Sequence, residues 1–194
     1  LMGSVGQASL LGLRTDYLVL GVMGVLITLG ALGYAIVEDV ARHRRWTRLA
    51  LESKVVLLAT VGLIIGGAAA IAIVEWDNAA TLGALQPVEK VLNSLFETVS
   101  LRTAGFTAFE TSALSQATLF VVMALMFIGG ASGSTAGGIK VNTFSVLLIA
   151  ILPTVRGRPS AEAFGRRVPH EIIYRAISVV LLSIAFVFVV ALGI

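Results

Sequence analysis

Residues 100–107 read SLRTAGFT, and their chemistry is that of the main chain rather than of reactive side chains. Backbone carbonyl groups that turn toward a common axis can replace the hydration shell of a dehydrated cation. Gly105 permits the backbone angles that such a crowded turn needs. A lipid-facing turn at the membrane interface would use similar residues, so spacing alone leaves both interpretations open. If the turn binds a cation, the candidate residues are Thr103, Ala104, Gly105 and Phe106.

A second unusual stretch, GGASGSTAGGIK, interrupts an apolar run. Three alternatives to a functional loop are close helix packing through small residues, a phosphate-binding loop and a broken transporter helix. The phosphate-binding pattern fails because Ile139 stands where a lysine is required. Packing alone does not need so many consecutive small residues, which favours a loop inside the membrane. Its residues are Gly129, Gly130, Ala131, Ser132, Gly133, Ser134, Thr135, Ala136, Gly137 and Gly138.

The composition indicates an integral membrane protein. Of the 194 residues, 57% are hydrophobic and 13% are charged, and the mean hydropathy is +0.97. Several uncharged runs approach the length of about 20 residues that crosses a bilayer. No removable signal peptide is recognisable. The partner that composition predicts is therefore the lipid bilayer.

The basic residues indicate the topology. Ten of the fourteen lie in two clusters beside apolar runs, which places both clusters in the cytoplasm by the positive-inside rule and argues against nucleic acid as a partner. The charged residues from Glu75 to Gln116 are mostly acidic, so this segment is expected outside. Glu97 and Glu110 are candidates for a solvated rim that enriches cations, and surface solubility alone explains them equally well. The basic clusters are Arg42, Arg44, Arg45, Arg48 and Lys54, and Arg156, Arg158, Arg166, Arg167 and Arg175.

The apolar runs predict an all-α architecture. Spans are expected over 17–37, 55–74 and 172–194. Pro87 suits the first turn of a helix, and apolar residues at helical spacing predict an amphipathic helix over 87–101 that is too short to cross. The turn 102–107 follows, and the run 117–152 is a helix broken by the glycine loop. Lys140 lies just after that loop and should face water or the cytoplasmic side, because a charge in lipid is costly.

Enzymatic chemistry has no support in the sequence. It contains no cysteine, and its two histidines, His43 and His170, are expected in loops and lack metal-ligand spacing. No set of residues that could place a nucleophile beside a general base and a general acid is recognisable. No covalent cofactor is expected.

At NSLFETVSLRTAGFT and MFIGGASGSTAGGIKVNTF the sequence resembles the Trk/Ktr/HKT superfamily of potassium-uptake proteins. The resemblance implies membrane proteins built from four helix, pore loop, helix repeats, with a broken pore-lining helix in the third. Residues 1–54 would be the end of the second repeat and a basic cytoplasmic loop, 55–152 the third repeat, and 153–194 a basic loop with the first helix of the fourth. An interior fragment of such a protein is the expectation.

The resemblance also implies roles for residues. Thr103 to Phe106 would form one quarter of a selectivity filter, with K+ at the backbone of Thr103, Ala104 and Gly105. The loop Gly129 to Gly138 would be a gate beneath the filter, and Arg102 and Lys140 would support these segments. The transported ion would be K+, with Na+ as a second candidate.

The function expected from the sequence is K+ uptake across the cytoplasmic membrane by a multi-pass protein. The resemblance further implies a homodimer and a cytoplasmic nucleotide-binding regulatory subunit. Two alternatives stay open: an ion-coupled secondary transporter whose broken helix binds a substrate, and a structural membrane subunit that does not conduct.

Overall fold

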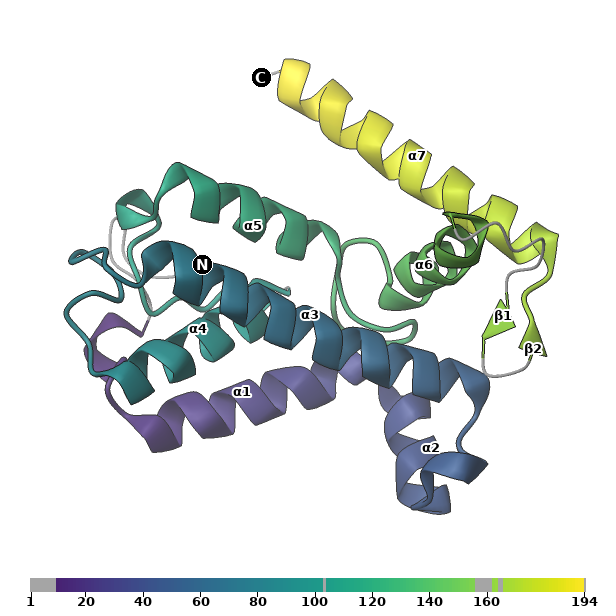
Figure 1. Cartoon of the computed structure of the whole chain (residues 1–194), viewed down its shortest axis with the longest axis horizontal. Helices are drawn as coiled ribbons and strands as arrows, with labels where there is room; N and C mark the ends of the chain where they lie inside the picture. Colours follow the sequence, from purple (N-terminus) through teal and green to yellow (C-terminus); the bar gives the residue numbers. More distant parts are fainter. Residues whose placement is uncertain (1–9, 103, 156–161, 164–165, 194) are drawn as a thin grey trace.

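The computed structural model describes residues 10–102, 104–155, 162–163 and 166–193. Helices dominate it, and two short strands pair antiparallel near the carboxyl end. Figure 1 shows the arrangement. The α-helices are α1 (Tyr17–Leu32), α2 (Tyr34–His43), α3 (Leu51–Glu75), α4 (Pro87–Leu101), α5 (Gln116–Phe127), α6 (Val141–Val155) and α7 (His170–Leu192). The 3-10 helices are η1 (Leu11–Leu13), η2 (Trp46–Arg48) and η3 (Thr111–Ala113), and the strands are β1 (Glu162–Ala163) and β2 (Arg166–Arg167).

Helix α3 is the central element of the molecule. It packs against α4, α5 and α6, while α4 lies between α3 and α1 (Figure 1). Among the described residues, α3 and α7 are each long and apolar enough to cross a membrane, and the bent pair α1 and α2 is a third candidate span. α5 and the apolar part of α6 are shorter.

Local sequence explains where the helices begin. The Asp16 carboxylate accepts hydrogen bonds from the Leu18 and Val19 amides at the start of α1, each at 3.1 Å. α4 begins at Pro87, whose missing N–H is not needed in a first helical turn. The Gln86 amide donates to the Glu89 carboxylate at 2.9 Å, which completes a capping box. The Ser115 hydroxyl accepts the Thr118 amide at the start of α5.

The apolar run 17–37 is not one straight helix. α1 ends at Leu32, and α2 leaves at an angle of 99°. Gly33 supplies the bend with φ +76°, in the left-handed region that favours glycine. A side chain there would lie 3.1 Å from the Ser132 carbonyl oxygen, so the bend is also packed closely. Hydropathy alone could not reveal this change of direction.

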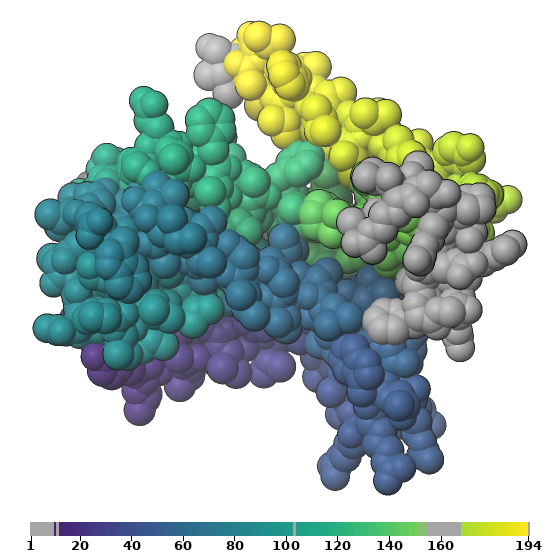
Figure 2. All heavy atoms as spheres, in the orientation of Figure 1, coloured from purple at the N-terminus to yellow at the C-terminus, as the bar shows by residue number. Residues whose placement is uncertain are grey.

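The connection between α2 and α3 and the β1–β2 pair lie at the same end of the molecule (Figure 1). Both segments carry basic residues, which is the arrangement that the positive-inside rule requires of cytoplasmic loops. Figure 2 shows α2 and α7 projecting from the packed body formed by α1, α3, α4 and α5.

Candidate functional site

The turn after α4 leaves the helix abruptly. The Ala104 and Gly105 amides both donate to the Ser100 carbonyl oxygen, at 2.9 and 3.1 Å. Gly105 has φ +75°, so the residue with no side chain stands where the backbone enters the left-handed region. Gly105 and Phe106 are exposed, and Ala104 is half-buried. Thr103 lies outside the described residues.

Two side chains of α4 make hydrogen bonds to the backbone at the end of the turn and just after it. The Ser100 hydroxyl donates to the Phe106 carbonyl oxygen. The Glu97 carboxylate accepts the Ala108 amide at 3.2 Å. This polar face of α4 points into the protein, so its side chains fix the position of residues 106–108, which follow the turn.

The expectation that Glu97 belongs to a solvated outer rim is wrong. Only 2% of Glu97 is exposed, because it lies between α4 and the chain after the turn, whereas Glu110 is exposed. A signal for this burial exists in the sequence. Polar residues recur along α4 at helical spacing and form one buried stripe, which comprises Lys90, Asn93, Ser94, Glu97 and Ser100.

The glycine-rich stretch separates α5 from α6, and its backbone bonds are made within the protein. Ile128 and Ile139 form an isolated parallel bridge. The Gly129 amide donates to the Ile139 carbonyl oxygen at 2.9 Å, the Ile139 amide to Phe127 at 2.9 Å and the Val141 amide to Gly130 at 3.0 Å. These bonds give part of the irregular backbone partners within the protein, which a loop inside a membrane would need.

Two glycines of the loop have no room for a side chain. A methyl group on Gly129 would overlap the Gly137 carbonyl oxygen. On Gly130 it would lie 2.6 Å from both the Ala136 side chain and the Ala31 carbonyl oxygen. The two halves of the loop and the end of α1 therefore approach closely through bare backbone.

The loop also contacts the bend between α1 and α2. The Ala131 amide donates to the Ala31 carbonyl oxygen at 2.8 Å. On the other side, the Ser132 amide donates to the Asn142 side chain at 2.9 Å. The loop thus rests on the carboxyl end of α1 and on the first turn of α6.

Arg102 and Lys140, the two basic residues predicted to support these segments, each contact the backbone of the loop. Arg102 is 3% exposed, and its Nη2 donates to the Gly129 carbonyl oxygen at 3.0 Å. Lys140 Nζ donates to the Ala136 carbonyl oxygen at 2.6 Å. Each cation therefore pairs with a backbone carbonyl group.

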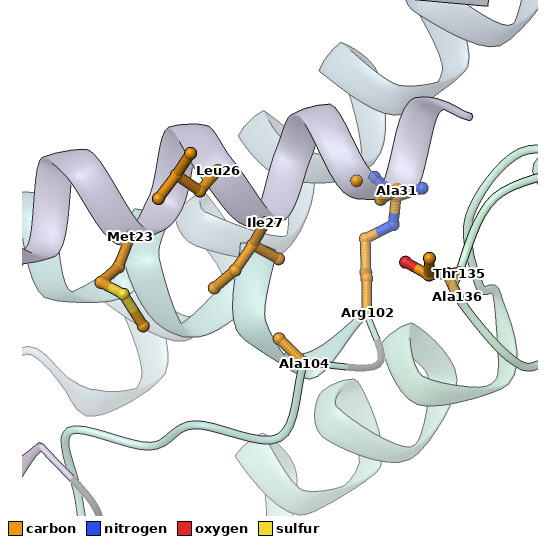
Figure 3. A pocket seen from close by; sticks show the side chains of 9 residues that line it. Met23, Leu26, Ile27, Ala31, Arg102, Ala104, Thr135 and Ala136 are labelled. Carbon is orange, nitrogen blue, oxygen red and sulfur yellow. The ribbon is translucent and has the colours of Figure 1, made fainter. Parts of the chain in front are cut away.

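The turn and the loop border the same cavity, with a volume of about 290 Å³. Ala104 from the turn and Thr135 and Ala136 from the loop line the cavity, and α1 forms its opposite side (Figure 3). The lining residues from α1 are Met23, Leu26, Ile27, Gly30 and Ala31. Within the described residues, no three histidine or acidic side chains lie close enough to hold a metal ion.

A second buried carboxylate, Glu75 at the end of α3, was not singled out from the sequence. It is fully buried and accepts the Ser115 amide at 2.9 Å and the Thr81 hydroxyl at 2.7 Å. The Asn78 side chain at 2.6 Å and the Thr118 hydroxyl complete its partners. Glu75 thereby joins the connection between α3 and α4 to the connection between α4 and α5.

Comparison with known proteins gives a consistent result. Residues 4–194 match the family model described as TrkH, cation transport protein. The chain is 37% identical over 188 residues to the potassium/sodium uptake protein NtpJ of Enterococcus hirae, a match that covers 96% of this chain and 42% of that protein. It is 35% identical over 173 residues to the Ktr system potassium uptake protein B of Bacillus subtilis, covering 89% of this chain and 38% of that protein.

A solved structure shares the fold. The crystal structure of the potassium transporter TrkH from Vibrio parahaemolyticus superimposes with a TM-score of 0.65 at 22% identity, covering 90% of this chain and 38% of that one. This likeness confirms the predicted all-α membrane fold. The chain spans about two fifths of the length of these relatives.

Proposed function

The chain belongs to the TrkH family of cation transport proteins, and on that premise we propose that it forms part of a pathway for K+ uptake across the cytoplasmic membrane. Residues Thr103 to Phe106 would contribute to the selectivity filter, and residues Gly129 to Gly138 would form a gate. The observation that carries the proposal is the shared cavity of about 290 Å³, which Ala104 of the turn and Thr135 of the loop both line.

The filter assignment is supported by the geometry of the turn. Gly105 adopts φ +75° directly after the carboxyl end of α4. The carboxyl end of a helix carries partial negative charge, which favours a cation nearby. The hydrogen bonds from Ser100 and to Glu97 hold the chain after the turn, so its backbone is positioned before an ion arrives.

The gate assignment is supported by the packing of the loop. Its close contacts use glycine backbone at Gly129 and Gly130, while Thr135 and Ala136 line the cavity. Such a segment blocks the space beneath the turn as long as its hydrogen bonds hold. Few side chains have to be rearranged when it leaves.

Uptake needs no chemical energy from this chain. One positive charge that crosses 100 mV gains about 2.3 kcal/mol, so an inside-negative potential drives K+ inward. Na+ is the second candidate ion, since one relative is named a potassium/sodium uptake protein. A homodimer and a cytoplasmic nucleotide-binding subunit are part of the proposal by family resemblance.

The test is growth and ion flux in a bacterium that lacks its own K+ uptake systems. We expect the complete gene to restore growth at low K+, and Gly105→Asp to abolish flux while the protein still reaches the membrane. Gly62→Ala is the matched control, because a methyl group on that α3 glycine meets no atom within 4 Å. Normal K+ flux in the Gly105→Asp variant would refute the filter assignment.

The gate is tested separately by deletion of residues 132–135. The deletion leaves the bridge between Ile128 and Ile139 and its neighbouring glycines in place, so the protein should still fold. We expect K+ flux to rise. Saturable uptake of another solute would favour a coupled transporter, and a folded protein without ion flux would favour a structural subunit.

A further inference from the structure

Arg102 occupies the junction of three segments. It follows α4 directly and begins the turn, yet its side chain extends past Thr135 toward the part of α1 that carries Ala31 (Figure 3). The side chain lines the cavity between the turn, the loop and α1. With 3% of its surface exposed, this arginine is buried at the centre of the proposed pathway.

The hydrogen bond from Arg102 to Gly129 joins segments that are distant along the chain. Nη2 and the Gly129 carbonyl oxygen are 3.0 Å apart across 27 residues of sequence. The covalent route between them runs out through η3 and back along α5. The side chain therefore provides a direct mechanical connection from the turn to the first residue of the loop.

Gly129 transmits a displacement to the rest of the loop. Its amide pairs with the Ile139 carbonyl oxygen, and its α-carbon packs against Gly137 without space for a methyl group. A shift of Gly129 must therefore move both halves of the loop. Conversely, a loop that leaves its place must break the bond to Arg102 or pull on it.

A cation suits this position for electrostatic reasons. Gly129 follows the carboxyl end of α5, and Ala31 lies in the last turn of α1, so two helix ends with partial negative charge meet the guanidinium group. Among the described residues, no carboxylate lies within ion-pair distance of Arg102. Arg102 Nε has no hydrogen-bond partner within that part of the chain. The charge thus interacts with main-chain dipoles of the elements that it joins.

We propose that Arg102 couples the filter turn to the gate loop, so that opening of the loop changes the filter and a change in the filter changes the loop. Arg102 is a positioning residue in this role, and it acts through the Gly129 carbonyl group. The inference rests on the proposed function of the two segments. Coupling of two sites through one contact is reciprocal, so both properties should respond to one substitution.

The first experiment is a double-mutant cycle in the complete protein, reconstituted into liposomes. Arg102→Met removes the charge and the donors at similar length, and it is combined with the deletion of residues 132–135. With the loop intact, we expect Arg102→Met to raise K+ flux about tenfold and to lower the preference for K+ over Na+, since one charge-assisted hydrogen bond is lost. In the deleted background, the same substitution should change flux less than twofold, because coupled sites are not additive.

Two control variants make the cycle specific. Arg175→Met removes an exposed arginine from α7 and should leave flux and selectivity unchanged. Arg102→Lys keeps the charge and a donor, and it should restore part of the wild-type selectivity. An equal effect of Arg102→Met in both loop backgrounds would overturn the coupling while leaving the gate in place. No effect of the deletion itself would refute the gate, and this inference with it.

A second measurement reports the loop position without ion flux. The 194 residues contain no cysteine, so Thr135→Cys introduces one thiol into this part of the protein. Any cysteine elsewhere in the complete protein is first replaced by serine, which leaves position 135 as the single site for a thiol reagent. We expect Arg102→Met to raise its modification rate severalfold in the folded protein, and Arg102→Lys to raise it less because it keeps the charge and a donor. Thr47→Cys on exposed η2 is the control and should react at one rate in every background. An unchanged rate at position 135 would contradict the coupling.

Discussion

The turn after α4 and the loop between α5 and α6 border one cavity, but they are held by opposite means. The turn depends on side chains of its neighbour, since Ser100 and Glu97 bond to the backbone of residues 106–108. The loop depends chiefly on its own backbone and on glycines that pack against carbonyl groups, and Arg102, Lys140 and Asn142 add side-chain hydrogen bonds. The turn should therefore be sensitive to removal of side chains elsewhere, and the loop to their addition.

The largest effect is expected where the loop has the least space. Gly129→Ala places a methyl group on the Gly137 carbonyl oxygen, so the loop cannot form. A loss of more than about 4 kcal/mol in stability is expected, which is the exceptional range for single substitutions. Thermal unfolding in detergent measures it. Gly133→Ala is the matched control: nothing lies within 4 Å, and the φ of +74° should cost only about 1 kcal/mol.

The turn should respond most to loss of the Glu97 carboxylate. Glu97→Ala leaves the buried Ala108 amide without its acceptor, which should cost about 1–3 kcal/mol. Glu97→Gln keeps an acceptor oxygen and should retain much of that stability. Thermal unfolding and the K+ to Na+ flux ratio of both variants check this prediction. Equal stability of Glu97→Ala and wild type would show that the carboxylate does not support the turn.

A smaller effect is expected from the hydroxyl group of Ser100. Ser100→Ala removes the hydrogen bond to the Phe106 carbonyl oxygen, at a cost of about 1 kcal/mol. The freed carbonyl group should also lower K+ selectivity. Ser178→Ala is a suitable control, because that hydroxyl bonds to its own helix at Tyr174 and is exposed. Flux ratios in liposomes should distinguish the two serines.

The smallest effect lies outside both regions, on α2 beyond the bend. Hydrogen bonds from the Ser53 hydroxyl and the Ala50 amide hold the pKa of Asp39 below its usual value. A lowered pKa means that the stabilisation is present above the ordinary pKa of an aspartate and is lost as the pH falls through the folded-state value. Asp39→Asn should therefore lower the melting temperature slightly at neutral pH, and the difference should vanish in acid. A difference that persists at low pH would exclude this ionised carboxylate as its source.

Hydropathy and glycine content predicted the long apolar helices and the interruption between α5 and α6, because both are properties of consecutive residues. The bend at Gly33 was not predicted, since an apolar run carries no information on direction. The burial of Glu97 and Glu75 was also missed. Their partners at Ala108 and Ser115 lie 11 and 40 residues away, and only the packed fold brings them together. The roles of Thr103 to Phe106 and of the loop stay predictions.

The internal pairing of the loop has a consequence for spectroscopy and mass spectrometry. The amides of Gly129, Ala131, Ile139 and Val141 all donate to backbone carbonyl oxygens. Such amides exchange their hydrogen for deuterium only when the segment opens. The rate of deuterium uptake in a peptide over residues 129–141 therefore measures the opening of the loop. It would record how often the loop leaves its place, even in a membrane across which no potassium gradient exists.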